Sequence, residues 1–355
     1  MRIAQVAPLY ESVPPKLYGG TERIVSYLTE ELVKQGHDVT LFASGDSLTQ
    51  AKLVPASPRA LRLDAKCADQ LAHHVLLLDS VFTQRHEFDI IHFHIDYLHF
   101  PLTRAMGWTT LSTLHGRLDI PDLVPIYQTF REMPVSSISN AQRRPLPWLN
   151  WQGTIYHGLP ESQYDFSPTS GGYLVFLGRT SPEKGLDQAI AIARRAGMPL
   201  KVGAKIDGAD LEYFNTCLKP LMNGSGVEFL GEVGFPEKNE LLGGAAALLF
   251  PIRWPEPFGI VMIEAMACGT PVIAYSQGSV PEIIEDGLTG FIVANADAAV
   301  KAVEKLGSFD RAACRRRFER RFTSSLMSSQ YLRLYKTLLR SQGEPIPASS
   351  GVPIG

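Results

Sequence analysis

The chain has 355 residues, of which 45% are hydrophobic and 20% charged, with a formal net charge of −2 at pH 7. That length suits two domains better than a single core, and the small net charge gives no general reason to bind nucleic acid. The sequence predicts no membrane span and no signal peptide. Its cysteines, scattered and without a CxxC pair, indicate reduced, buried thiols rather than a disulfide framework. We therefore expect a globular cytoplasmic protein that does not bind nucleic acid.

Short apolar segments alternate with helical patterns along the whole chain. Ile24, Leu28 and Leu32 recur at helical spacing before Gly36. The segments expected to be strands cover 2–8, 38–44, 89–94, 109–115 and 153–157 in the first half and 173–178, 200–204, 227–231, 246–251, 271–275 and 290–294 in the second. This alternation predicts an α/β fold with parallel sheets covered by helices on both faces.

A segment rich in Pro, Ser and Gly, at 158–172, divides the expected strands into two sets. We expect two doubly wound domains, 1–160 and 173–324, that face each other across a cleft and present ligand-binding groups at the carboxyl ends of their strands. A last helix over about 325–341 is expected to pack back on the first domain. Residues 342–355 read as a disordered tail.

The segment "WPEPFGIVMIEAMACGTPV" (254–272) places two carboxylates, Glu256 and Glu264, in apolar surroundings that disfavour unpartnered charge. A helix is expected to begin near Phe258 or Gly259, so its free N–H groups would lie between the two acids and suit a phosphate. Carboxylates also accept hydrogen bonds from paired hydroxyls. A sugar, a diphosphate and a ribose in a row would explain both acids. Two surface acids that flank a helix start are the alternative.

Three further segments follow expected strands. In "FLGRTSPEKG" (176–185), Arg179 and Lys184 suit a diphosphate, or they are solvated loop cations. In "YGGTERIV" (18–25), Gly19 and Gly20 allow close approach of the backbone to a ligand, or they form a simple turn. His115 ends a strand and faces the expected cleft, although a lone histidine is more often structural than catalytic.

The run "HFHID" offers His92, His94 and Asp96 at alternating positions at the end of a strand, a spacing that could hold a metal ion. No further cluster of ligands follows them, so a polar cleft wall is the favoured interpretation.

The basic run "RAACRRRFERRF" (311–322) could bind anionic lipid or nucleic acid. Because Phe318 and Phe322 are four residues apart, we expect one side of a helix to pack on the protein while the arginines are solvated. Weak peripheral membrane contact stays open, and the sequence leaves the oligomeric state undetermined.

Taken together, these motifs resemble those of the retaining glycosyltransferases of family four, whose GT-B architecture has two Rossmann-like domains facing a cleft. The most specific is E-x7-E, here "EPFGIVMIE", followed by "AMACGTPVIA" and "GSVPEIIEDGLTGFIV". "GRTSPEKG" matches the phosphate-binding loop of the family. The resemblance extends from "GGTER" to the "YLRLY" helix, and it is less diagnostic in the N-terminal half, which chooses the acceptor in this family.

The resemblance implies roles for individual residues. Glu264 would bind the ribose of a nucleotide-sugar and Glu256 the transferred sugar, while Arg179 and Lys184 would neutralise the diphosphate in place of a metal. His115 would lie near the donor sugar and complete the catalytic set. The remaining donor-binding residues implied in this way are Gly19 and Gly20 over the phosphates, Gly178, Val233 at the base, and Phe258, Gly259, Ile260 and Val261 around the sugar and phosphates. His157–Gly158 stands where many relatives have Asn-Gly, and no role is expected of His157.

The expected activity is that of a retaining hexosyltransferase. It would move a sugar from a nucleoside-diphosphate sugar, with UDP as the expected nucleotide, to a hydroxyl of a carbohydrate or small-molecule acceptor. The reaction implied by the family takes place on one face of the sugar and requires no metal, cofactor or enzyme nucleophile. A sugar-nucleotide epimerase on the same fold and an inactive nucleotide-sugar binding protein are the alternatives, and analysis of the products would distinguish them.

Overall fold

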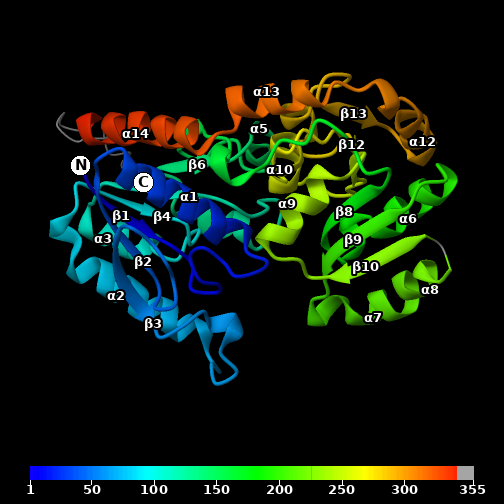
Figure 1. Cartoon of the computed structure of the whole chain (residues 1–355). Helices are drawn as coiled ribbons and strands as arrows, with labels where there is room; N and C mark the ends of the chain where they lie inside the picture. The colour runs from blue at the N-terminus through cyan, green and yellow to red at the C-terminus, as the bar shows by residue number, and fades with distance from the viewer. Residues whose placement is uncertain (225, 342–355) are drawn as a thin grey trace, which may run out of the picture.

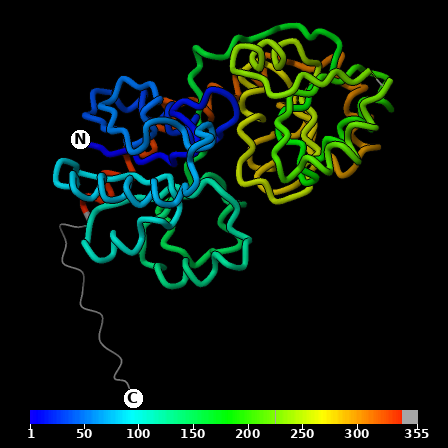
Figure 2. Tube along the Cα trace, turned by 90° about the horizontal axis from the view of Figure 1, so that it is seen from below, coloured from blue at the N-terminus to red at the C-terminus, as the bar shows by residue number. Residues whose placement is uncertain are grey.

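The computed structural model describes residues 1–224 and 226–341, which form two lobes, each built on a parallel β-sheet (Figures 1 and 2). The strand order is β3-β2-β1-β4-β5-β6-β7 in the first sheet and β10-β9-β8-β11-β12-β13 in the second. Both orders are those of a doubly wound sheet, with one strand added at the end of the first. The predicted α/β class with two Rossmann-like lobes is therefore confirmed.

The strands of the first sheet are β1 (Arg2–Val6), β2 (Asp38–Ser44), β3 (Lys52–Ser57), β4 (Ile90–Phe93), β5 (Thr110–Thr113), β6 (Val135–Ser137) and β7 (Trp151–Thr154). Those of the second are β8 (Leu174–Arg179), β9 (Leu200–Lys205), β10 (Val227–Gly231), β11 (Ala247–Phe250), β12 (Val272–Tyr275) and β13 (Gly290–Val293). The sequence interpretation missed β3 and β6. Pro55 argues against a strand in β3 but is tolerated there because β3 is an edge strand, and β6 is only three residues long.

Helices cover both sheets (Figure 1). Those of the first half are α1 (Gly20–Lys34), α2 (Gln70–Thr83), α3 (Phe100–Met106), α4 (Leu123–Thr129) and α5 (Asn140–Arg143). Those of the second half are α6 (Leu186–Arg195), α7 (Leu211–Tyr213), α8 (Lys219–Met222), α9 (Phe235–Gly243), α10 (Ile260–Ala267), α11 (Val280–Ile283), α12 (Ala296–Glu304), α13 (Arg311–Arg321) and α14 (Ser324–Ser341).

The chain crosses between the lobes twice, and the two crossings lie side by side. Leu159, after β7, donates its amide to the carbonyl of Phe322 (2.8 Å) and accepts the amide of Ser324 (2.9 Å). From there α14 returns to the first lobe and packs against α1 (Figure 1). This helix covers the segment predicted at 325–341. The tail predicted at 342–355 lies outside the described residues.

One apolar core runs through the seam between the lobes. It extends from Ile3 and Leu28 in the first lobe, through Leu159, to Met262 and Val272 in the second, all fully buried or nearly so. Burial of apolar surface is the main favourable term in folding, so this continuous core holds the two sheets in a defined relation. The space left between them is therefore a cavity with fixed walls.

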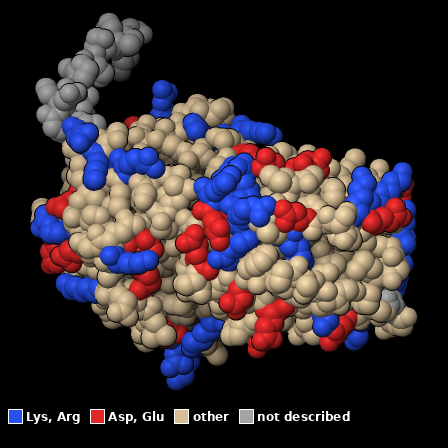
Figure 3. Space-filling view, turned by 45° about the horizontal axis from the view of Figure 1, so that its top comes forward, with Lys and Arg blue, Asp and Glu red and all other residues tan. Residues whose placement is uncertain are grey.

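The basic run over α13 differs from the expectation. Phe318 and Phe322 are buried as predicted, but not all of the arginines are solvated. Arg311 donates to the carbonyls of Ala245, Gly243 and Ser167 at 2.7–2.9 Å, and Arg315 donates to carbonyls that include that of Ala267, the last residue of α10. Helix ends leave carbonyls without partners, and these guanidinium groups satisfy them. Arg315, Arg316 and Arg317 pair with Glu319, Asp310 and Glu285, and Figure 3 shows basic and acidic side chains side by side in the middle of the face in view.

The cysteines agree with the sequence interpretation only in part. All four are free thiols, and Cys268 and Cys314 are buried, but Cys217 is exposed and Cys67 is half-buried. Across the residues that the structure describes, no helix combines the length and apolar character needed to cross a membrane.

Candidate active site

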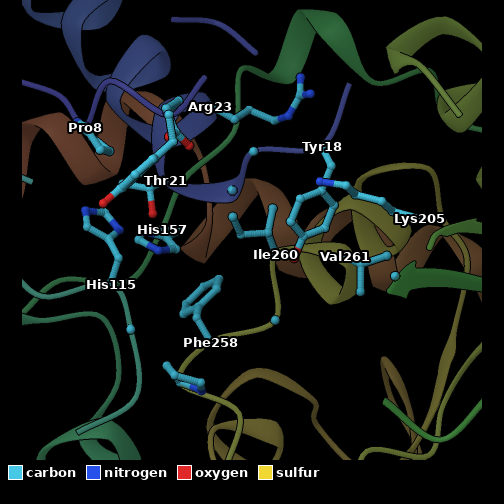
Figure 4. A pocket seen from close by; sticks show the side chains of 18 of the residues that line it. Pro8, Tyr18, Thr21, Arg23, His115, His157, Lys205, Phe258, Ile260 and Val261 are labelled. Carbon is cyan, nitrogen blue, oxygen red and sulfur yellow. The ribbon is translucent and has the colours of Figure 1, made fainter. Parts of the chain in front are cut away.

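A cavity of ≈ 600 Å³ lies between the lobes, within the range of small-molecule sites. Residues that follow β1, β4, β5 and β7 line it from the first lobe, and residues at the ends of β8 and β9 line it from the second. The carboxyl ends of both parallel sheets therefore open on the same space, which is where ligands bind in doubly wound folds. Figure 4 shows side chains from both lobes converging on it.

Two helices begin at this cavity, one from each lobe. α1 begins at Gly20 and α10 at Ile260, and a Cβ on Gly20 would lie 3.4 Å from Cδ1 of Ile260. Gly259 precedes α10 with φ +76°, a conformation that favours glycine. The helix start predicted near Phe258 or Gly259 is confirmed. Amides that lack partners at two facing helix N-termini suit an anion.

Glu256 accepts two hydrogen bonds on the same carboxylate oxygen. Lys184 Nζ lies 2.5 Å from Oε2, and the indole N–H of Trp254 donates to it at 3.0 Å. The side chains of Lys184 and Glu256 are only 14% and 12% exposed, and the lysine ammonium also lies 5.0 Å from the centre of the Trp254 ring. Glu256 is thus not a free surface acid.

Gly278 and Ser279, part of the "GSVPE" motif, contact the backbone of the loop that carries Glu256 and hold it in place. The Ser279 amide donates to the Glu256 carbonyl (3.0 Å), and its hydroxyl donates to the Phe258 carbonyl (2.8 Å). Gly278 has φ +54°, and a Cβ there would lie 2.4 Å from the Glu256 backbone. Only glycine permits this approach, so the motif fixes the position of the carboxylate without touching the cavity.

Glu264, inside α10 and 3% exposed, holds a second lysine. Its Oε1 contacts the ammonium of Lys238 from α9 and accepts the Tyr164 hydroxyl at 3.1 Å. Burial lowers the pKa of Lys238, while the Glu264 charge works in the opposite direction. The two acids that the sequence singled out therefore each neutralise one cavity lysine.

A third lysine, Lys205 at the end of β9, also lines the cavity. Its ammonium lies 3.1 Å from Asp207 Oδ1 and 5.5 Å from the centre of the Tyr18 ring (Figure 4). Arg179 contacts the other oxygen of Asp207 at 3.5 Å and Glu183 at 3.0 Å. Two carboxylates therefore bind the Arg179 guanidinium, and Arg179 is not among the residues that line the cavity.

The structure brings the other predicted site residues together around this space. They are Gly19, Gly20, His115, Gly178, Lys184, Val233, Glu256, Phe258, Gly259, Ile260, Val261 and Glu264. Val233 lies against Gly203, where a Cβ would come within 2.8 Å of Val233 Cγ2. Leu177 packs on the same glycine, so apolar side chains line the cavity here.

His92 belongs to a buried network that involves the C-terminal helix. Its Nδ1 lies 2.7 Å from the Tyr335 hydroxyl and its Nε2 lies 2.7 Å from the Thr113 hydroxyl. Both ring nitrogens already have partners, and the described residues contain no group of three or more His, Cys, Asp or Glu arranged to hold a metal ion. The residue is part of the packing between α14 and the first sheet.

The same network sets the tautomer of His115. Gln5 donates to the Tyr335 hydroxyl, which leaves Gln5 Oε1 to accept from His94 Nε2 at 2.9 Å. His94 is neutral because burial holds its pKa well below the usual value, so its Nδ1 must accept from His115 Nε2, also at 2.9 Å. Burial lowers the pKa of His115 to about 3. The Nδ1 atom of this neutral ring is therefore an acceptor, and it has no partner.

His157, to which the sequence gave no role, lies in the cavity wall beside His115 (Figure 4). The two rings stack with centres 5.3 Å apart and planes 17° apart, and the Phe258 ring of the second lobe lies 4.7 Å from that of His157. The next residue, Gly158, is pressed against the backbone of Thr323, which fixes the place where the chain leaves the first lobe. The Nδ1 atom of His157 is buried without a partner.

Sequence reasoning missed Tyr18, Arg23, Lys205, Lys238 and His157 as lining residues. Lys205 could have been found, because it ends a strand whose carboxyl end faces the cleft. Tyr18 and Arg23 lie in the segment 18–25 that had been singled out for its glycines, and His157 ends the strand expected at 153–157, whereas Lys238 is brought to the cavity only by the tertiary fold.

Comparison with known proteins agrees with this geometry. The model of "Glycosyltransferase Family 4" matches residues 18–154, and that of "Glycosyl transferases group 1" matches residues 163–319. The phosphatidyl-myo-inositol mannosyltransferase of Mycobacterium leprae is 25% identical, over 96% of this chain and 98% of its own. Among solved structures, AviGT4, a glycosyltransferase involved in avilamycin A biosynthesis, is 24% identical with a TM-score of 0.73, over 96% of this chain and 98% of its own. The structure of Anabaena HepE in complex with UDP-glucose is 18% identical with a TM-score of 0.71, over 95% of this chain and 100% of its own.

Proposed function

The chain belongs to the group 1 glycosyltransferases of family 4, and we propose that it transfers a hexose from a UDP-sugar to an acceptor hydroxyl with retention of configuration. The observation that supports this most is the convergence of two helix N-termini and three half-buried lysines, Lys184, Lys205 and Lys238, on one cavity. Anions bind at helix N-termini and beside lysines. The relative crystallised with UDP-glucose supports a UDP-sugar as the donor.

The donor fits the cavity in one direction. The uracil would lie by Val233 and Tyr18, the ribose by Glu264, and the diphosphate between the starts of α1 and α10. Lys184 and Lys205 would neutralise the phosphate charge. Arg179 would act indirectly, because it binds Asp207, which also binds Lys205. The transferred sugar would then lie between Glu256 and His115.

This arrangement supplies the elements of a transfer reaction without a metal. As the glycosidic bond breaks, negative charge grows on the diphosphate, and fixed lysines and amides stabilise it without reorganisation. The leaving phosphate can accept the proton of the acceptor hydroxyl that attacks from the same face. The walls from the two lobes hold donor and acceptor together, which lowers the entropic part of the barrier.

A donor screen tests the proposal. Ligands that bind only the folded state raise its melting temperature, so the purified protein should be stabilised by UDP and by one or a few UDP-sugars. That donor, with a carbohydrate acceptor, should give a new glycoside. An epimerised donor, or binding without turnover, would favour the epimerase or the inactive binding protein instead.

Two further measurements test the finer parts. Activity should survive EDTA, because the lysines carry the charge that a metal would otherwise supply. Loss on chelation and recovery with one divalent ion would contradict that. Proton NMR at early times should show the anomeric configuration of the donor in the product, and the opposite anomer would rule out retention.

A further inference from the structure

Asp96 has the most unusual backbone in the described part of the chain. With φ +52°, it is the one residue other than glycine there with a left-handed conformation. Asp tolerates this region better than most residues, but the conformation still costs free energy and tends to occur at functional sites. Asp96 lies directly after β4 and lines the cavity. The strain is therefore located in the wall of the candidate site.

The Asp96 carboxylate has no cation beside it. Burial raises the pKa of this carboxyl to about 6, and the nearby backbone N–H of His115 works in the opposite direction. No described salt bridge includes Asp96, and the groups that its charge affects are the hydroxyls of Tyr10 and Tyr127. The side chain is half-buried in the cavity wall, and a carboxylate partly removed from water without a compensating charge is costly unless a ligand completes its hydrogen bonds.

The first lobe contributes both acids and cations to this cavity, and its cations already have partners, as Arg23 does in the carbonyl of Leu17 (2.9 Å). Glu22 of α1 is 5% exposed and lines the cavity. Arg62, on the same wall, is held by Glu11 at 2.9 Å. His115 presents an acceptor nitrogen, as its hydrogen bond to His94 requires. The three donor-side lysines lie on the second lobe, and Arg23 and Arg62 of the first lobe are already engaged, so Asp96 and Glu22 are carboxylates of this wall for which the described residues provide no ion pair.

We propose that Asp96, next to His115, is the anchor of the acceptor subsite and that this subsite selects a neutral, hydroxyl-bearing sugar. The inference rests on the proposed transferase function and specifies its second substrate. A hydroxyl of the acceptor donates to the carboxylate, as hydroxyl groups do readily to charged oxygens. An acceptor with a carboxylate or phosphate near its reacting hydroxyl would bring like charge to Asp96 and be disfavoured.

The test uses the full chain, the UDP-sugar that stabilises it, and matched acceptors. Methyl α-glucoside, methyl α-mannoside and methyl α-galactoside are compared with glucuronic acid, galacturonic acid and mannose 6-phosphate, and acceptor-dependent release of UDP is followed. The variants are Asp96→Asn, which retains the left-handed preference and an acceptor for the His115 amide, and Asp96→Ala. Asp79→Asn, on the exposed face of α2 and outside the cavity, is the control.

The parent should prefer neutral glycosides. Loss of a hydrogen bond to a charged group, worth 1.5–3 kcal/mol, should raise the acceptor KM of Asp96→Ala by roughly 10- to 150-fold. In both variants the affinity for UDP should be unchanged, and in Asp96→Asn the ratio of anionic to neutral acceptor use should rise. A purely structural role would not change that ratio.

Three results would overturn the inference while leaving the transferase function intact. They are a parent that uses no neutral glycoside, a parent that prefers the uronic acids or the sugar phosphate, and an Asp96→Asn variant with unchanged acceptor KM and selectivity. By contrast, a parent that binds no nucleotide-sugar would overturn the proposed function, and the inference with it.

Discussion

Replacing Glu264 by Gln should destabilise the protein before it affects any ligand. The carboxylate is 4% exposed and its lysine partner, Lys238, is 15% exposed, so both charges are largely removed from water. Gln keeps the size of the side chain and can still accept the Tyr164 hydroxyl. It cannot neutralise the ammonium, and burial already lowers the pKa of Lys238.

The magnitude follows from the burial of the pair. Removing one partner of a buried ion pair costs about 3–5 kcal/mol, because the remaining charge is left uncompensated. Removing both charges with groups of similar volume is often close to neutral. Glu264→Gln should therefore lower the free energy of unfolding by about 3 kcal/mol or more, and adding Lys238→Met should restore most of that loss.

Urea titration followed by circular dichroism measures this difference. Glu240→Gln, on the exposed side of the same helix as Lys238, is the matched control and should change stability by less than about 0.5 kcal/mol. The reasoning is refuted if Glu264→Gln loses less than about 1 kcal/mol, or if the double variant is as unstable as the single one.

The double variant Glu264→Gln with Lys238→Met also allows the contribution of Glu264 to nucleotide binding to be measured in a stable protein. Binding of UDP to the stable double variant, measured by calorimetry and compared with binding to Lys238→Met alone, isolates the contribution of Glu264 to the ribose. Loss of one hydroxyl-to-carboxylate hydrogen bond should weaken it by roughly 10- to 150-fold. An unchanged affinity would mean that the ribose does not lie beside Glu264.

Other consequences of the geometry can be tested separately. Lys205→Ala should weaken UDP binding by roughly 10-fold or more in calorimetry. Arg179→Ala should weaken it less, because two carboxylates hold that guanidinium away from the cavity. If Arg179→Ala had the larger effect, the Arg179 side chain would have to move into the cavity when UDP binds. Because burial raises the pKa of Asp96 to about 6, the folded state binds the proton more tightly than the unfolded state, so stability falls as pH rises through that value. Asp96→Asn should then be more stable than the parent by up to about 3 kcal/mol at pH 8, with the gain disappearing toward pH 4; a gain that is independent of pH would contradict this. His157→Phe should retain the stacking, remove an unpartnered nitrogen and raise the free energy of unfolding by about 1 kcal/mol in urea titration, whereas a loss of stability would show that the nitrogen has a partner.

The sequence was most informative where a site is contiguous. Glu256 and Glu264 lie within nine residues of each other, and the start of α10 between them could be inferred from glycine and from apolar periodicity. The strand pattern was equally readable, because parallel strands buried on both faces are short apolar runs. Two strands were not predicted. Pro55 interrupts the apolar pattern of the edge strand β3, and β6 has only three residues.

What could not be predicted depends on pairing across the fold. Lys238 contacts Glu264 from α9, and His157 contacts His115 from another strand end. Neither relation leaves a local pattern in the sequence. The arginines of α13 illustrate the same limit, since their helical spacing says nothing about the carbonyls at the ends of α9 and α10 that they bind.

Arg179 shows how one carboxylate can decide which cation serves a site. It ends β8, next to Lys205 at the end of β9, and the two residues are paired in register. Asp207 contacts both, with Lys205 at 3.1 Å and Arg179 at 3.5 Å. Since Glu183 also binds the guanidinium, Arg179 is the more fully neutralised of the two. An incoming diphosphate would therefore draw first on Lys205, whose only described ion pair is with Asp207. The strand-end rule predicted Arg179 at this cavity, whereas Lys205 lines it, because Glu183 and Asp207 together hold the Arg179 guanidinium.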